Sequence, residues 1–163
     1  MANDILAGIK SEFTVDFCFV KNMESSSDKS EVIEINVLKI ERLFKIFTIY
    51  SPPNNKPNFS FLNSSSHTIF LEDFNAHSPM WGCNDSNEAR KSVEDLLNPS
   101  TFELIYNSND PHTCLHYNGT STTPDLLLLS SDVSDLTKRS VLDDPGSDHR
   151  QIIADISFGS PSK

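Results

Sequence analysis

Apolar and polar residues alternate along three stretches in the first half of the chain. In residues 31–41 the sequence EVIEINVLKIE places Ile33, Ile35 and Val37 on one side, and this period of two is typical of a strand with one buried face. Residues 43–50 are richer in aromatic and β-branched side chains and predict a more deeply buried strand, and residues 67–74 predict a third strand. Weaker patterns predict an antiparallel pair of strands at residues 5–10 and 13–20. Further strands are predicted at residues 125–130 and 151–158, with a short edge strand around Val141.

One segment has the spacing of a helix. Val93, Leu96 and Leu97 recur at intervals of three and four residues, after residues 88–92, and Pro99 is expected to end or kink this helix. The connections between the strands are too short for helical crossovers between parallel strands. The pattern therefore predicts an α+β fold with two packed, mostly antiparallel β-sheets flanked by helices.

The composition indicates one soluble globular domain. The chain has 163 residues, of which 37% are hydrophobic and 22% charged, enough for one sizeable core and too few for two. No apolar run approaches the roughly 20 residues of a membrane span, so no membrane partner is expected. Residues 1–10 lack the features of a secretory signal, and Cys18, Cys83 and Cys114 show no paired spacing. These features favour an intracellular location, in the cytoplasm or the nucleus.

The charge balance limits what the chain can bind. With 13 basic and 23 acidic residues, the formal net charge is −10. Affinity for nucleic acid comes largely from Lys and Arg side chains that displace counterions. The acidic balance therefore argues against tight binding to a phosphate backbone, unless carboxylates hold a cation that then meets the phosphate.

Polar side chains of the kinds used in catalysis lie at the ends of four predicted strands. Hydrolysis of a phosphodiester needs oxygen ligands for Mg²⁺ and an imidazole that handles protons. A carboxylate behind that imidazole would fix its tautomer. The groups at the four strand ends are Tyr50, Asp73 with Asn75, Asp125, and Asp148 with His149. If they converge on one edge of a sandwich, they form such a site.

Four sequence blocks that contain these residues resemble the motifs of one superfamily. They are TIYSPPNN, LEDFNAHSPMWG, TPDLLLLS and LDDPGSDHRQI. The blocks are similar, in order and spacing, to those of the endonuclease/exonuclease/phosphatase superfamily, in the variant found in the endonuclease domains of non-LTR retrotransposons of the jockey and RTE kind. The resemblance covers residues 47–153. It implies a four-layer α/β/β/α sandwich like that of DNase I.

The resemblance also implies a role for each matching residue. Asp73 would activate or position the attacking water, and Asn75 would hold a phosphate oxygen beside it. His149 would stabilise the phosphoryl group or transfer a proton, and Asp125 would orient its ring. The other implied roles are phosphate contact for Tyr50, a place in the metal environment for Asp148, and either shaping of the substrate groove or packing under the loop for His77 and Trp81.

The resemblance implies a cofactor and partners as well. The cofactor would be Mg²⁺, with Mn²⁺ as a substitute, and the substrate would be DNA. In a full-length protein the partner would be the reverse transcriptase domain of the same element. A phosphatase or phospholipase of the same fold is a weaker alternative, because a fold does not determine its substrate.

Two departures from the family pattern bear on activity. The family has an Asn in its first strand and then a Glu that is its main direct Mg²⁺ ligand, and neither has a counterpart here. Residues 1–20 resemble the strands after that Glu, so the domain is expected to be incomplete at its N-terminus. Glu72 replaces a Gly and is expected to raise the pKa of Asp73. The two hypotheses are therefore a DNA endonuclease with impaired activity and a catalytically inactive remnant of one.

Each matching residue also fits a role without chemistry. Asp73 and Asn75 fit an Asx-rich turn, and Asp148 and His149 fit a turn with a helix-like cap. Asp125 fits the start of a strand, and Tyr50 fits a core or rim aromatic. The agreement of four blocks in order favours the catalytic interpretation for Asp73 and Asn75, and the position before the last strand favours it for Asp148 and His149. Both interpretations stay open for Asp125, and a core or rim position is the commoner one for a residue such as Tyr50.

A zinc site is a rival interpretation of a different segment. His112, Cys114 and His116, with Cys83 as a fourth ligand, are residue types that bind zinc. Such sites normally combine two matching ligand pairs, and only one half is present here. The segment around Cys114 is therefore expected to form a polar, alternating hairpin.

Overall fold

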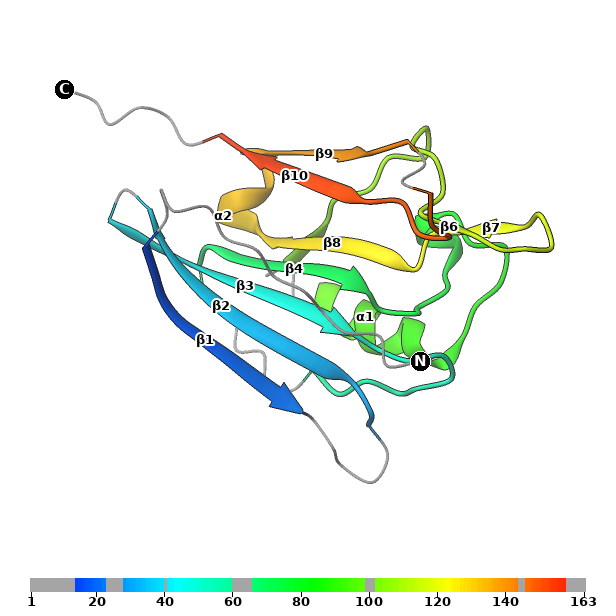
Figure 1. Ribbon diagram of the computed structural model, residues 1–163, viewed down its shortest axis with the longest axis horizontal. Coiled ribbons are helices and arrows are strands. Elements are labelled where there is room, and N and C mark those ends of the chain that lie inside the picture. The colour runs from blue at the N-terminus through cyan, green and yellow to red at the C-terminus, as the bar shows by residue number, and fades with distance from the viewer. Residues whose placement is uncertain are drawn as a thin grey trace.

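The computed structural model describes residues 14–22, 28–39, 41–59, 66–98, 102–143 and 146–157. Within these ranges a six-stranded sheet forms the centre of the molecule (Figure 1). Neighbouring strands are antiparallel, except that β3 and β4 are parallel. In spatial order the strands are β1 (Thr14–Asn22), β2 (Glu31–Lys39), β3 (Arg42–Tyr50), β4 (Thr68–Asp73), β8 (Asp125–Ser130) and β5 (Phe102–Leu104).

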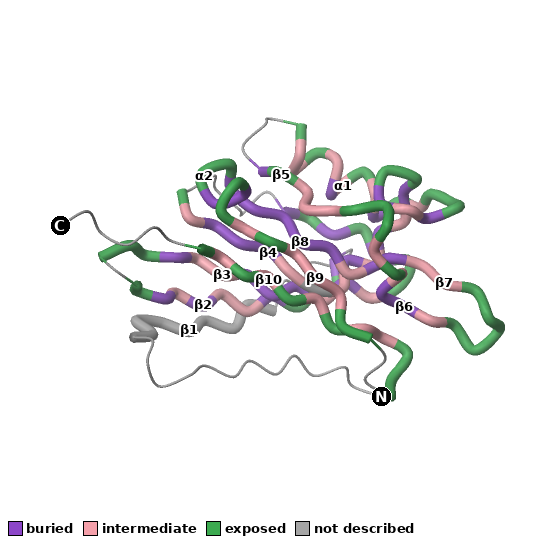
Figure 2. Tube along the Cα trace, turned by 90° about the horizontal axis from the view of Figure 1, so that it is seen from above, coloured by how far each residue is buried: buried purple, intermediate pink, exposed green. Residues whose placement is uncertain are grey.

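Two small antiparallel sheets and short helices surround this sheet. β9 (Thr137–Val141) pairs with β10 (Ile152–Ile156), and β6 (Cys114–Leu115) pairs with β7 (Ser121–Thr122). The helices in the described ranges are η1 (Pro79–Trp81), a 3₁₀ turn, and the α-helices α1 (Glu88–Leu97) and α2 (Ser131–Ser134). The β9–β10 pair and α1 lie on opposite faces of the six-stranded sheet, which gives the described part three layers (Figures 1 and 2).

Both faces of the sheet are apolar. One face packs against α1 through a cluster that includes Phe70 and Val93. The other face packs against β10 through a cluster that includes Ile69 and Ile156. Residues 126–129 of β8 alternate between the two clusters, and all four are buried. A strand covered on both faces needs a continuous apolar run, which is why β8 has the sequence DLLLLS. Figure 2 shows the buried stretch along β4 and β8.

The sequence just before α1 determines where the helix begins. The side chain of Asn87 accepts a hydrogen bond from the backbone N–H of Arg90 at 3.2 Å, which caps the first turn. Glu88 in that turn interacts favourably with the positive end of the helix dipole. Ala89 and Val93 lie one turn apart and are buried against the sheet.

The predicted fold class is confirmed, because the protein is a mixed α+β structure with several antiparallel sheets and few helices. The strands expected at residues 31–41, 43–50, 67–74 and 125–130 are all present, with ends shifted by one or two residues. The predicted helix is α1, and the predicted hairpin around Cys114 is the β6–β7 pair. Residues 5–10, Pro99 and Phe158 lie outside the described ranges, and β1 pairs with β2.

The zinc interpretation finds no support in the described ranges. The ring of His112 contacts the hydroxyl of Thr123 at 3.0 Å, and the ring of His116 contacts that of Thr122 at 3.0 Å. The potential metal-binding group found among the described residues lies elsewhere and contains no cysteine. None of the described helices combines the length and the apolar character that crossing a membrane requires.

Candidate active site

Two carboxylates face each other at one end of the six-stranded sheet. Asp73, the last residue of β4, is the register partner of Asp125, the first residue of β8. Side chains two positions apart on a strand point to the same face. Leu71 and Leu127 belong to the core on the β10 side, so Asp73 and Asp125 also point to that side. The alternation of side chains along β4 and β8 thus places both carboxylates on the same face of the sheet, next to each other.

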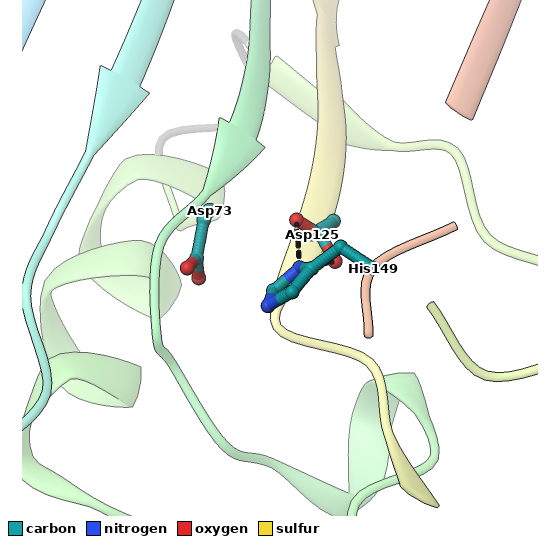
Figure 3. A group of neighbouring side chains, drawn as sticks. All are labelled: Asp73, Asp125 and His149. Atoms are coloured by element: carbon teal, nitrogen blue, oxygen red, sulfur yellow. Dashed lines mark hydrogen bonds and ion pairs between the residues drawn. The ribbon is translucent and has the colours of Figure 1, made fainter. Parts of the chain in front are cut away.

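His149 reaches the same place from the segment before β10. The backbone carbonyl of Asp148 accepts a hydrogen bond from Leu115 at 2.7 Å, and the N–H of Arg150 donates to Thr113 at 2.7 Å. These bonds fix the backbone on both sides of His149. Its Nδ1 then lies 3.2 and 3.1 Å from the two carboxylate oxygens of Asp125 (Figure 3).

The three side chains form one compact group. Asp73, Asp125 and His149 each offer a ligand atom, and these atoms lie within 4.8 Å of one another. Figure 3 shows the imidazole ring beside Asp125, on the side toward Asp73. Three segments that are far apart in the sequence therefore converge as the motif blocks predicted. We call Asp73, Asp125 and His149 the acid–imidazole cluster.

Asn75 supports Asp73 directly. Its backbone N–H donates to Oδ1 of Asp73 at 2.9 Å, and its side-chain Nδ2 donates to Oδ2 at 2.9 Å. The same Nδ2 donates to the carbonyl of Ser51 at 2.8 Å. The left-handed backbone of Asn75, with φ of 44°, is a conformation that Asn tolerates better than most residues. Both of these side-chain hydrogen bonds lie within the protein, so in this structure Asn75 orients the carboxylate of Asp73.

The pKa values of His149 and Asp73 are both raised, for different reasons. The hydrogen bond that His149 donates to Asp125 raises the pKa of His149 to about 9. Burial opposes this rise, and the charges of Asp125, Asp73 and Asp148 add to it. Burial raises the pKa of Asp73 to about 6, with a further contribution from the charge of Asp125. At neutral pH the cluster therefore contains an imidazolium held by one carboxylate, next to a second carboxylate that titrates close to neutrality. The side chain of Glu72, which was expected to raise the pKa of Asp73, lies outside the described part of the chain.

Tyr50 and Asp148 lie near the cluster without belonging to it. Tyr50 ends β3, which runs parallel to β4, so both strands end at the same edge of the sheet. The next residue, Ser51, donates its N–H to the carbonyl of Asp73 at 2.9 Å. Asp148 is exposed, is not one of the three clustered side chains, and acts on His149 through its charge.

His77 and Trp81 have structural contacts in the loop after β4. The ring of His77 contacts the carboxylate of Asp85 at 3.0 Å. Trp81 is fully buried, and its indole N–H donates to the carbonyl of Ala76 at 2.8 Å. Of the two roles that the sequence suggested for Trp81, the structure therefore shows packing under the loop, because a side chain with no exposed surface cannot line a substrate groove.

Asn87 is a residue of this region that the sequence analysis missed. Besides capping α1, its Oδ1 accepts from the N–H of His77 at 2.9 Å. Its Nδ2 donates to the carbonyl of Asn75 at 2.6 Å. One side chain thus ties the start of α1 to the loop that carries Asn75. An Asn directly before an acidic residue and a helical pattern is a recognised cap signal, and it was available in the sequence.

The cluster is partly exposed. The side chain of His149 is 38% exposed and that of Asp125 is 14% exposed. Asp73 is half-buried. His149 is therefore the more accessible member of the His149–Asp125 pair.

Comparison with known proteins agrees with this description. The structure is similar to the endonuclease domain of TRAS1, a telomere-specific non-LTR retrotransposon, with a TM-score of 0.64 and 16% identity. The match covers 85% of this chain and 67% of the TRAS1 chain. The fold is therefore the DNase I-like fold that the motif blocks implied.

The family follows from the sequence. The model of the endonuclease–reverse transcriptase family matches residues 44–153, which is more than half of the 163 residues. The chain belongs to the endonuclease–reverse transcriptase family. No curated protein sequence is significantly similar to it.

Proposed function

We propose that this chain is a DNA endonuclease domain of a non-LTR retrotransposon, and that it hydrolyses phosphodiester bonds with the help of a divalent cation. The observation that carries the proposal is the acid–imidazole cluster, which three distant segments form at one end of the six-stranded sheet. Membership of the endonuclease–reverse transcriptase family supports the choice of reaction. Two carboxylates and an imidazole are the groups that phosphodiester hydrolysis needs.

Asp73 would act on the attacking water. In the metal-free protein its pKa is about 6, so the carboxylate is mainly ionised at neutral pH. It would position the water in line with the P–O bond that breaks, and the water's proton would pass to solvent as its oxygen bonds to phosphorus. The two hydrogen bonds from Asn75 hold the carboxylate in one orientation while this happens.

His149 would stabilise the charge that develops on the phosphoryl oxygens. Its Nδ1 is paired with Asp125, so the other ring nitrogen, Nε2, is available to donate a hydrogen bond to the substrate. The raised pKa keeps the ring protonated at neutral pH, which strengthens this donation. Asp125 orients the ring and stabilises its charge.

The donor set fits a hard divalent cation. Mg²⁺ prefers oxygen ligands, is often bound by one or two carboxylates plus substrate phosphates, and retains waters. Asp73 and Asp125 would hold it, whereas a protonated His149 would not be a ligand. When bound, Mg²⁺, or Mn²⁺ in its place, supplies positive charge that offsets charge on the phosphate. Because only two carboxylates contribute within the described ranges, we expect weak binding and activity that needs millimolar cation.

DNA is the proposed substrate. The formal charge of −10 opposes binding to phosphates, so association with DNA should depend on the cation. In a longer protein the reverse transcriptase of the same element would be the partner domain, as the family description suggests.

A nicking assay on supercoiled plasmid tests the proposal. We expect the protein to nick the plasmid with Mg²⁺ or Mn²⁺, and EDTA to abolish nicking. Asp73→Ala and His149→Ala should each lower the rate by at least about 10²-fold. Asp155→Ala is the matched control, because this exposed carboxylate on β10 lies six residues beyond His149 and away from the cluster.

The alternative is a catalytically inactive remnant, which the small number of carboxylates in the cluster favours. If the unsubstituted protein fails to nick DNA at any Mg²⁺ or Mn²⁺ concentration while remaining folded, this alternative is correct. Nicking that persists in both Asp73→Ala and His149→Ala would instead mean that the chemistry takes place elsewhere.

A further inference from the structure

A buried polar network lies beside the acid–imidazole cluster. It consists of Asp28, Asn55 and Ser51, which are 2%, 7% and 0% exposed. The side-chain Nδ2 of Asn55 lies 3.0 Å from Oδ1 of Asp28 and 3.1 Å from the hydroxyl of Ser51. The network thus joins the residues just before β2 to the loop that follows β3.

Asp28 is the charged anchor of this network. Its carboxylate accepts hydrogen bonds from the backbone N–H groups of Ser30 at 2.9 Å and Asn58 at 2.8 Å, in addition to the bond from Asn55. Burial raises the pKa of Asp28, but the bonds from Asn55, Asn58 and Ser30 outweigh burial and lower it. A buried carboxylate that stays ionised and has several donors holds the segments that supply those donors firmly in place.

Ser51 connects the network to the site. Its hydroxyl accepts from Asn55, and its backbone carbonyl accepts from Nδ2 of Asn75 at 2.8 Å. That Nδ2 also donates to Oδ2 of Asp73 at 2.9 Å. Hydrogen bonds therefore link Asp28 to Asp73 through Asn55, Ser51 and Asn75. The link from Ser51 to Asn75 uses the backbone carbonyl of Ser51, and the other links join side chains.

We infer that Ser51 is a positioning residue for the proposed hydrolysis, because it transmits the rigid placement of the Asp28–Asn55 pair to the carboxylate of Asp73 through Asn75. The inference rests on the proposed function. Ser51 is too buried to touch a substrate. It therefore acts on the reaction only by fixing the position of its backbone carbonyl, which accepts the hydrogen bond from Asn75. Misplacement of a reacting group by about 1 Å can lower a rate by about 10²-fold.

Ser30 provides a matched control. Its hydroxyl accepts from the same Nδ2 of Asn55 at 2.9 Å, and its side chain is 3% exposed. Ser30→Ala and Ser51→Ala therefore remove similar buried hydroxyls bonded to the same donor, so their costs in stability should be similar. Only Ser51 leads on to Asn75 and Asp73.

The test compares the two variants by nicking kinetics and by NMR. Ser51→Ala should lower kcat by about 10-fold with KM changed less than about twofold, since the carboxylate acts in the transition state. Ser30→Ala should leave kcat within about threefold of the unsubstituted protein. In the metal-free protein, Ser51→Ala should shift the side-chain amide resonances of Asn75, and Ser30→Ala should leave them in place.

The two readouts separate failure of this inference from failure of the proposed function. If the unsubstituted protein does not nick DNA, the proposed function is wrong, and the Asn75 resonances alone decide whether Ser51 controls the orientation of Asn75. If the two variants change kcat and these resonances equally, or if Ser51→Ala changes neither, Ser51 is a structural residue and the inference is overturned.

Discussion

Asp73 and Asp125 are direct cross-strand partners on adjacent antiparallel strands, with their carboxylates on the same face of the sheet. Like charges in this position repel each other and destabilise a sheet. The protein offsets the repulsion by bonding one carboxylate to His149 and the other to Asn75. An arrangement that costs stability and receives such specific support is typical of a functional site.

A divalent cation should stabilise the folded protein. A cation held between Asp73 and Asp125 binds the native state and offsets their repulsion. At ten times its dissociation constant it would add about 1.4 kcal/mol, which raises Tm by roughly 3–6 °C for a chain of this size. Differential scanning fluorimetry with and without MgCl₂ measures the shift. Asp73→Asn should lose most of the shift and Asp155→Ala should keep it, and an equal shift in all three proteins would place the ion elsewhere.

Replacing Asp125 with Asn should change the titration of His149. The hydrogen bond with Asp125 is the main cause of the high pKa of His149, about 9, so Asp125→Asn should return it toward 6.5, the ordinary value. The chemical shift of the His149 ring proton, followed against pH in metal-free buffer, measures this. The same variant should nick DNA at least about 10²-fold more slowly at pH 8, because its imidazole is then mainly neutral and one proposed carboxylate ligand of the cation is lost. An unchanged titration curve would show that the pairing is not formed in solution.

The contributions of His149 and Asp73 to the stability of the metal-free protein should fall as pH rises. His149 has a folded pKa of about 9 against an ordinary value of 6.5, so its contribution is fully present below pH 6.5 and is lost as pH rises through 9. Asp73 has a folded pKa of about 6 against 3.8, so its penalty is absent below 3.8 and complete above 6. Both effects have the same sign.

Urea unfolding in EDTA measures this dependence. The difference in unfolding free energy between the unsubstituted protein and His149→Ala should shrink between pH 6.5 and 9, the window given by the two pKa values. A difference that stays constant over this window would mean that His149 titrates with its ordinary pKa.

Trp81 should be a major determinant of stability rather than of substrate binding. Its indole is fully buried and bonded to Ala76. Trp81→Ala should lower the unfolding free energy by about 3–5 kcal/mol. Met80 is the neighbouring control, because it is 59% exposed, and Met80→Ala should change the free energy by less than about 0.5 kcal/mol. Chemical denaturation of the unsubstituted protein and the two variants measures these changes. Equal losses of unfolding free energy in Trp81→Ala and Met80→Ala would show that Trp81 is not packed in the core.

The glycine after Trp81 should also be difficult to replace. Gly82 has a φ of 81°, and a Cβ there would overlap the hydroxyl of Tyr106. Gly82→Ala should cost at least about 1–2 kcal/mol from the left-handed backbone alone, with the overlap adding to it. Tyr106→Phe removes the hydroxyl, so the double variant should lose less than the sum of the two single changes. Strict additivity in thermal unfolding would show that the overlap is relieved in another way.

Local sequence pattern identified most residues of the candidate site but not their contacts. Asp73, Asp125 and His149 were identified from their positions beside predicted strands and from the motif blocks, and the structure brings them together. Asn75 was also identified, but its assignment to a phosphate oxygen came from the resemblance. Its contacts with Ser51 and Asp73 depend on how β3 and β4 lie beside each other. Asn87 was missed because its contacts with the Asn75 loop cross from a helix to a strand end.

The sequence by itself determined the strands and the helix, because period-two alternation, β-branched runs and an Asn cap act through neighbours within a few residues. It also determined which polar groups stand at strand ends, and hence the class of chemistry. Tertiary structure decided which of these groups meet. Asp73 and Asp125 are separated by 52 positions, and only the pairing of β4 with β8 sets them face to face. It also decided that Trp81 is buried, because burial depends on packing between layers that no local pattern specifies.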